Sequence, residues 1–216
     1  MTVATSLALG LGGGHSPAHA ASDNTVVVFD ASNSMNSRFE KSQRIREAKQ
    51  ALIDAARRTG VNPGLVVFGS RQVQSCGDVA TLVPVNANNP AQMAAALAGI
   101  RAMGVSSLAA AMGAAAAEVS SQGQPAKMLV IADGAGVKSC RVDTCTFATE
   151  LKSQNPNLSI SVVAVSPKPQ EVPSLRCISQ ATGGNYFEVR TTRGLRSAMV
   201  QALAAPLPAI AIARIM

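Results

Sequence analysis

Tryptophan is absent from the 216 residues of this chain, tyrosine occurs once, and all aromatic residues together make up 3% of the sequence. Proteins that hold single-stranded nucleic acids or sugars commonly stack them on aromatic side chains, and this chain has almost none to offer. Nothing in the sequence resembles a nucleic-acid-binding motif. We therefore expect no nucleic-acid partner.

Histidine is nearly absent as well, and its two copies, His15 and His19, lie in a segment typical of a secretory signal peptide. An apolar stretch is followed by a Gly-rich break and by Ala18-His19-Ala20, an A-x-A cleavage signature. We therefore expect residues 1–20 to be a signal peptide and the protein to be periplasmic or secreted. No Lys or Arg precedes the apolar stretch, which leaves open a start further upstream or an ordinary chain terminus.

Cleavage after Ala20 would leave a mature chain without histidine. Ser-His and Cys-His nucleophile pairs, His-ligated zinc and a histidine general base all require an imidazole. The export hypothesis therefore excludes these catalytic and metal-binding mechanisms.

The length of the chain and its 47% content of hydrophobic residues suit one well-buried domain. We expect this domain to span residues 21–204. Two prolines, Pro206 and Pro208, stop the last expected helix. They begin an apolar C-terminal tail, residues 205–216, whose apolar run is too short to cross a bilayer.

Much of the net charge of +7 lies between Arg38 and Arg58. Ile45, Ala48 and Leu52 recur there at helical spacing, so we expect the charges to cover the outer face of an amphipathic helix. A solvated face is the favoured interpretation, and attraction to an acidic partner or an anionic membrane surface is the alternative. The basic residues are Arg38, Lys41, Arg44, Arg46, Lys49, Arg57 and Arg58, against Glu40, Glu47 and Asp54.

Apolar runs bounded by Gly, Pro or Asn alternate with helical patterns, which indicates a parallel sheet wrapped by helices. The expected strands are residues 25–29, 65–69, 79–84, 127–132, 159–165 and 185–188. The expected helices are residues 41–59, 91–102, 108–120, 147–153, 174–182 and 193–204. A short gap between the second and third strands predicts a hairpin. The fold class is therefore a doubly wound α/β sheet of six strands, mostly parallel, with one antiparallel edge strand and helices on both faces.

Three oxygen-bearing side chains, Asp30, Ser32 and Ser34, alternate directly after the first expected strand. Alternation directs their oxygens to one side, as a hard cation requires. The structural alternative is that Ser32 or its neighbour Asn33 only caps the following helix. Asp133 follows another buried strand, and ligands of such sheets bind beyond the carboxyl ends of the strands. The sequence therefore favours a site at this edge.

The pattern Asp30-x-Ser32-x-Ser34 resembles the metal-ion-dependent adhesion site (MIDAS, D-x-S-x-S) of von Willebrand factor type A (VWA) domains. The family supplies a Thr from a G-x-T-P-L loop, and here Gly104-Val105-Ser106-Ser107-Leu108 carries Ser106 in its place. The family's last Asp corresponds to Asp133. Ser106 keeps the hydroxyl but lacks the methyl group that restricts the threonine rotamer.

The resemblance extends over about residues 24–204 and is closest to secreted bacterial members of the family. It includes Gly69, the Cys-containing segment after Asp133, and the segments 175–178 and 181–187. It implies a VWA fold, which is Rossmann-like.

The resemblance also implies a metal site and a function. The hydroxyls of Ser32, Ser34 and Ser106 would hold Mg²⁺, or Mn²⁺ or Ca²⁺ in its place, with Asp30 and Asp133 orienting waters or one of them binding directly. An open coordination position would then take an acidic side chain of a protein partner. The expected function is a metal-dependent protein-binding module and not an enzyme.

Four cysteines in an exported chain suggest two disulfides, which allow three connectivities. On the strand order that the resemblance implies, Cys76 and Cys177 lie too far apart to pair. We prefer Cys76 with Cys140 and Cys145 with Cys177, and a local bridge between Cys140 and Cys145 is the alternative.

Two other functions compete with metal-dependent binding. Aspartyl-phosphate hydrolases also carry an Asp after a strand, but they need a second Asp two residues on, where this chain has Ser32. The other alternative is a VWA scaffold that no longer binds metal.

Overall fold

The computed structural model describes residues 24–85, 90–120, 124–136 and 140–206. The expected signal peptide, residues 1–20, lies outside this part, as do residues 207–216 of the expected C-terminal tail. The predicted domain limits are therefore not tested at these two ends.

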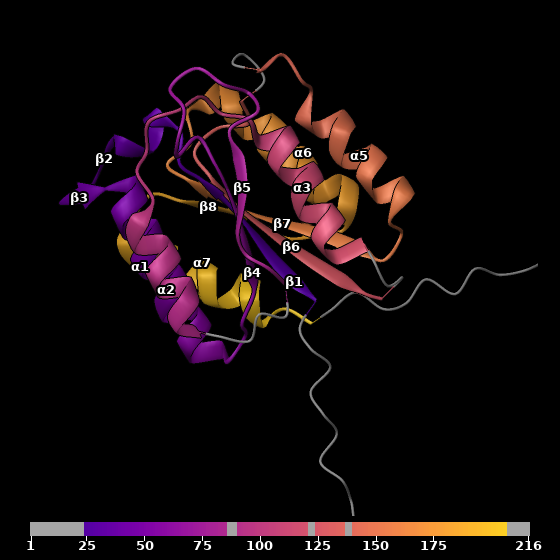
Figure 1. Ribbon diagram of the computed structural model, residues 1–216, viewed down its shortest axis with the longest axis horizontal. Coiled ribbons are helices and arrows are strands. Elements are labelled where there is room, and N and C mark those ends of the chain that lie inside the picture. Colours follow the sequence, from indigo (N-terminus) through magenta and orange to yellow (C-terminus); the bar gives the residue numbers. More distant parts are fainter. Residues whose placement is uncertain (1–23, 86–89, 121–123, 137–139, 207–216) are drawn as a thin grey trace, which may run out of the picture.

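A six-stranded sheet forms the centre of the molecule, in the order β5-β4-β1-β6-β7-β8 (Figure 1). Neighbouring strands are parallel except β5, which runs antiparallel to β4 at one edge. The strands are β1 (Thr25–Asp30), β4 (Gly64–Phe68), β5 (Val79–Val83), β6 (Ala126–Ala132), β7 (Leu158–Val165) and β8 (Tyr186–Val189). The predicted fold class is confirmed.

Helices cover both faces of the sheet, as expected (Figure 1). On one face lie α1 (Arg44–Thr59), α2 (Pro90–Gly99) and α7 (Thr192–Ala204), and on the other lie α3 (Leu108–Ser120), α5 (Thr144–Gln154) and α6 (Val172–Thr182). The strand β1 supplies both hydrophobic cores, because Val27 and Phe29 point to the first set of helices and Val26 and Val28 to the second. The central strand is therefore buried over its whole length.

The first helix begins three residues later than expected, at Arg44. The preceding residues form a small hairpin of β2 (Arg38–Phe39) and β3 (Ser42–Gln43). Phe39 is buried, and Glu40 has a left-handed backbone with φ 51°. The tight turn that buries Phe39 is incompatible with helix at Lys41, so the prediction for residues 41–43 is wrong.

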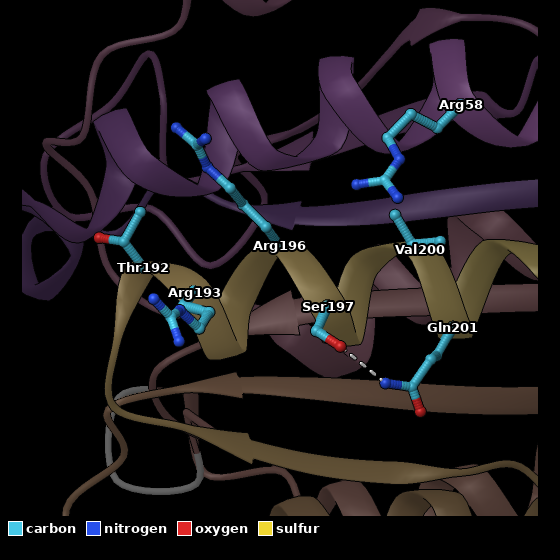
Figure 2. A pocket seen from close by; sticks show the side chains of 7 residues that line it. All are labelled: Arg58, Thr192, Arg193, Arg196, Ser197, Val200 and Gln201. Carbon is cyan, nitrogen blue, oxygen red and sulfur yellow. Dashed lines mark hydrogen bonds between the residues drawn. The ribbon is translucent and has the colours of Figure 1, made fainter.

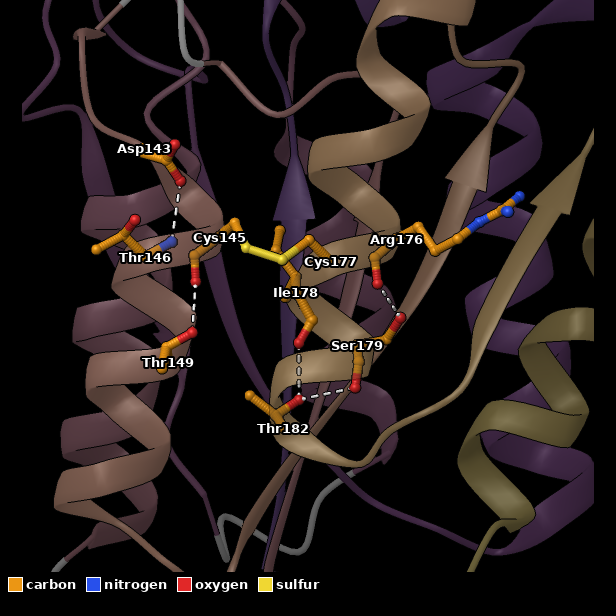
Figure 3. The surroundings of a disulfide bond; sticks show 9 residues. All are labelled: Asp143, Cys145, Thr146, Thr149, Arg176, Cys177, Ile178, Ser179 and Thr182. Carbon is orange, nitrogen blue, oxygen red and sulfur yellow. Dashed lines mark hydrogen bonds between the residues drawn. A yellow bond between two sulfur atoms is a disulfide. The ribbon is translucent and has the colours of Figure 1, made fainter.

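Two disulfides are present, and they follow the preferred pairing. Cys76–Cys140 joins the loop before β5 to the segment after β6. Cys145–Cys177 joins α5 to α6 across their contact, as Figure 3 shows. The second bridge therefore links two helices on one face of the sheet.

None of the helices in the described ranges is both long and apolar enough to cross a membrane.

Removing the bridge between α5 and α6 should weaken the fold. In the unfolded chain this bridge closes a loop between two cysteines that are 32 residues apart, and the Cys145→Ser/Cys177→Ser variant removes that restriction. We expect its free energy of unfolding to fall by about 4 kcal/mol, from the entropy of the released loop. Urea denaturation without reductant measures the difference. Thiol-reagent labelling of the unfolded, non-reduced wild type should find no reactive thiol, and labelling of all four cysteines would contradict both bridges.

Candidate functional site

The carboxyl ends of two adjacent strands bring the two predicted aspartates together. The parallel pairing of β1 with β6 places Phe29 beside Ile131, so Asp30 and Asp133 leave the sheet at the same edge. Ser32 pairs with Gly104 of the following loop, and the amide of Asn33 donates to the Gly104 carbonyl at 2.9 Å. Gly69 lies between the two segments and packs closely on both: a Cβ at Gly104 would lie 2.7 Å from Cα of Gly69, and a Cβ at Gly69 would lie 3.0 Å from Cα of Ser32.

A chain of hydrogen bonds connects four of the five predicted residues. The Ser32 amide donates to Oδ1 of Asp30 at 2.7 Å, and Ser34 Oγ donates to Oδ1 of Asp133 at 2.7 Å. The hydroxyls of Ser32 and Ser34 are 3.0 Å apart. Because Ser34 has one hydroxyl proton, which goes to Asp133, Ser32 is the donor between them. Ser32 precedes the 3₁₀ helix η1 (Asn33–Asn36) without a side-chain capping bond, so the capping alternative does not account for its hydroxyl.

The fifth residue, Ser106, lies against the loop that follows Asp133. Gly136 has φ 71°, and a Cβ at this glycine would lie 2.7 Å from Oγ of Ser106. No hydrogen bond joins the Ser106 hydroxyl to the other four side chains in the structure as described. The glycine thus lets the Asp133 loop close over Ser106.

Two oxygens of the site are buried without a hydrogen-bond partner: Oδ2 of Asp30 and Oγ of Ser106. Buried polar atoms are rarely left unpaired, and such atoms call for a missing ligand, ion or water. Carboxylate and hydroxyl oxygens are donors that Mg²⁺, Mn²⁺ and Ca²⁺ accept. The donor chemistry therefore fits a hard cation. Within the described residues, no three His, Cys, Asp or Glu side chains form a metal cluster, so a site here must use hydroxyls.

Arg44, the first residue of α1, turns inward and forms an ion pair with Oδ2 of Asp133. The side chains are only 13% and 4% exposed, and Nε of Arg44 is buried without a partner. The expectation that Arg44 belongs to the solvated face is therefore wrong. A signal was present in the sequence, since Arg44 shares its helical row with Ala48, Ala51 and Ala55, all buried.

Lys49 also departs from the solvated face. Its Nζ donates to the carbonyl of Ile100 at 2.5 Å, and partial burial lowers the pKa of this ammonium. Only the remaining basic side chains of this segment match the expectation of an outer charged surface.

Glu171, the last residue of the 3₁₀ helix η2 (Pro169–Glu171), is a further acidic group beside the site. Its Oε2 accepts a hydrogen bond from the amide of Ala135 at 2.9 Å, two residues after Asp133. The residue stands in an irregular segment after β7, where no sequence pattern distinguishes it. Sequence reasoning therefore missed it.

Burial, and after it the neighbouring carboxylate of Asp133, raise the pKa of Asp30 to about 7, although hydrogen bonds from Ser32 act to lower it. The folded protein therefore prefers the protonated carboxyl, whereas the unfolded chain has an ordinary aspartate. A group with a raised folded pKa stabilises the fold at low pH, and this contribution is lost as the pH rises from about 4 through about 7.

The Asp30→Asn variant should remove this pH dependence. In chelator, the wild type should lose on the order of 4 kcal/mol of unfolding free energy relative to the variant as the pH rises from about 4 to about 8. Denaturant unfolding at several pH values measures it, and other carboxyl groups cancel in the difference. A difference that is constant over this range would contradict the raised pKa of the buried Asp30 carboxyl.

Comparison with known proteins identifies the fold. A sequence profile described as the von Willebrand factor type A domain matches residues 25–135, just over half of the chain. A search of curated proteins gives no match.

Solved structures share the fold. The VWA domain of SpRpn10 is 12% identical, with a TM-score of 0.62 over 82% of this chain and 93% of that chain. A von Willebrand factor type A protein from Catenulispora acidiphila is 16% identical, with a TM-score of 0.65 over 85% of this chain and 42% of that chain. The PilB minor pilin from Streptococcus sanguinis is 12% identical, with a TM-score of 0.62 over 83% and 60% of the two chains. Likeness at identities this low shows a shared fold alone and carries no conclusion about activity.

The profile match and the six-stranded sheet lead to one assignment: this chain belongs to the von Willebrand factor type A domain family, whose members commonly mediate protein interactions.

Proposed function

We propose that this protein is a non-enzymatic, metal-dependent binding module that captures an acidic side chain of a protein partner. The observation that carries the proposal is the hydrogen-bonded set of Asp30, Ser32, Ser34 and Asp133 next to Ser106, which packs against Gly136 of the loop after Asp133; Oδ2 of Asp30 and Oγ of Ser106 are buried and unpartnered. These residues would hold Mg²⁺, with Mn²⁺ and Ca²⁺ as substitutes.

The proposed ligands divide into neutral and charged groups. The hydroxyls of Ser32, Ser34 and Ser106 would bind the cation directly, and the carboxylates of Asp30 and Asp133 would hold it there or orient its waters. Few anionic direct ligands leave most of the charge of the cation uncompensated, so a carboxylate from outside is attracted to an open position.

The surroundings of the site offer apolar contact area for the same partner. Val73 and Val142 are 64% and 40% exposed, unlike the other large hydrophobic side chains of the described residues. Each lies close in sequence to one end of the bridge Cys76–Cys140, which ties their two loops together. The disulfides also support the proposal that the protein is exported to the periplasm or secreted after loss of residues 1–20.

One observation favours the alternative of a scaffold without metal. Arg44 already supplies a positive charge to Asp133. A site in which this guanidinium permanently compensates the carboxylate needs no cation. Metal titration distinguishes the two functions.

Replacing two ligand hydroxyls should abolish the metal response. Wild-type protein should be stabilised by Mg²⁺, by about 2.7 kcal/mol at a concentration of one hundred times Kd. The Ser32→Ala/Ser34→Ala variant should fold but lose this gain, together with Mg²⁺-dependent capture of a partner from a periplasmic fraction. The matched control is Ser37→Ala, an exposed serine of the same loop. Equal stabilisation of wild type and double variant, or none in either, would leave the scaffold function.

Removing the guanidinium should make the site depend more on metal. In chelator, Arg44→Met leaves the buried Asp133 carboxylate unpaired, so we expect a loss of about 3 kcal/mol in unfolding free energy. Addition of Mg²⁺ should restore more stability to this variant than to wild type, because the cation then has no competing charge. Thermal unfolding and calorimetric titration measure both effects. The same Mg²⁺ gain in both proteins would show that Arg44 does not oppose the cation.

A further inference from the structure

The helices α1 and α7 pack together on the sheet face opposite to α3, α5 and α6 (Figure 1). A groove lies between them. Its main hollow has a volume of about 590 Å³. A smaller hollow of about 230 Å³ adjoins it and shares Arg58, Arg196 and Val200 with it. We call the two hollows together the arginine groove, after the four arginines that line them: Arg57, Arg58, Arg193 and Arg196.

The two helices present their arginines to the same space. Figure 2 shows Arg58 reaching from α1 toward α7 and Arg196 reaching from α7 toward α1. All four arginines are exposed. The ion pairs found in the described part of the chain involve other arginines, namely Arg44, Arg71 and Arg190.

The acidic groups at the groove do not balance this charge. Asp54 lines the smaller hollow and accepts a hydrogen bond from Gln50 at 2.9 Å. Glu40 lies at the head of α7, where Oε2 accepts from the Thr192 amide at 2.9 Å. Four cations thus face one lining carboxylate, with a second at one end.

Between the arginines the groove offers other contacts. Val200 is partly buried and packs on the core below, so it gives the groove an apolar surface. Gln201 donates to Ser197 Oγ at 2.9 Å along the outer side of α7 (Figure 2). Guanidinium groups bind carboxylates in a bidentate manner, and the combination with an apolar contact suits a peptide.

We propose that the arginine groove binds an acidic peptide segment of a protein partner, independently of metal. The concave shape favours a segment over a membrane, because a flat lipid surface would meet the outer helix edges and leave the hollow and Val200 without contact. The Arg58 end of the groove lies far from the proposed metal site, because Arg58 follows Arg44 by fourteen residues on α1, roughly 21 Å along the helix axis. The other end, at Thr192, lies beside Glu40 of the hairpin that precedes α1.

A labelled peptide tests this binding directly. The probe is a short fluorescein-labelled peptide of Asp and Glu with one Leu, and fluorescence anisotropy in EDTA measures its affinity at low and at physiological ionic strength. We expect binding to wild type that weakens with salt. The Arg58→Gln/Arg193→Gln/Arg196→Gln variant should bind at least about tenfold more weakly, because charge-assisted hydrogen bonds are lost.

Matched variants separate the groove from net charge. The Arg38→Gln/Arg101→Gln/Lys168→Gln variant removes the same charge from exposed positions elsewhere and should keep wild-type affinity. The Arg58→Lys/Arg193→Lys/Arg196→Lys variant keeps the charge and should bind the peptide more weakly than wild type but more tightly than the glutamine variant. Circular dichroism confirms that all variants fold.

Three outcomes would overturn the proposal: equal loss in the glutamine control, equal binding of a neutral Ser-Gly peptide, or binding to anionic phospholipid vesicles without binding to the peptide. The Ser32→Ala/Ser34→Ala variant should bind the peptide as wild type does. The result is therefore independent of the metal-dependent function.

Discussion

The burial of the Asp30 carboxylate at the end of the central strand is the constraint on which the site depends. The strand β1 is covered on both faces, and Asp30 at its carboxyl end is completely buried. Its Oδ1 accepts a hydrogen bond from the Ser32 amide, but its Oδ2 has no hydrogen-bond partner. A buried anion is costly unless it is paired, so the loop must either keep the carboxyl protonated or bring a cation close.

The neighbouring carboxylate of Asp133 is also buried and also needs a positive charge, which Arg44 supplies. Two buried acids at one sheet edge repel each other, which helps to raise the pKa of Asp30. The guanidinium compensates Asp133 but makes no ion pair with Asp30. A single positive charge therefore stabilises only Asp133, and the deprotonated Asp30 carboxylate is the anion that a divalent cation would meet. The serine hydroxyls add donors without adding charge.

Much of this arrangement could be predicted from the sequence, because it follows from periodicity and strand ends. Val26–Val28 predict a buried strand, and the alternation of Asp30, Ser32 and Ser34 places their oxygens together. The hairpin at Phe39 could not be predicted, since the surrounding charges fit a helix equally well and only tertiary burial of Phe39 decides. Glu171 reaches the site from an irregular segment, where its position depends on how that segment packs.

The helix α1 connects the two surfaces that we assign to binding, and its rigidity relates them. Arg44 at its first turn faces the metal site, whereas Arg57 and Arg58 at its last turn face the groove. The same helix thus has a largely buried arginine at its first turn and exposed arginines at its last turn. It is therefore not a uniform basic face. A partner that places an acidic residue at the metal site and an acidic segment in the groove would meet both at a fixed spacing. The second contact would then be intramolecular, so each weak contact would raise the effective concentration of the other.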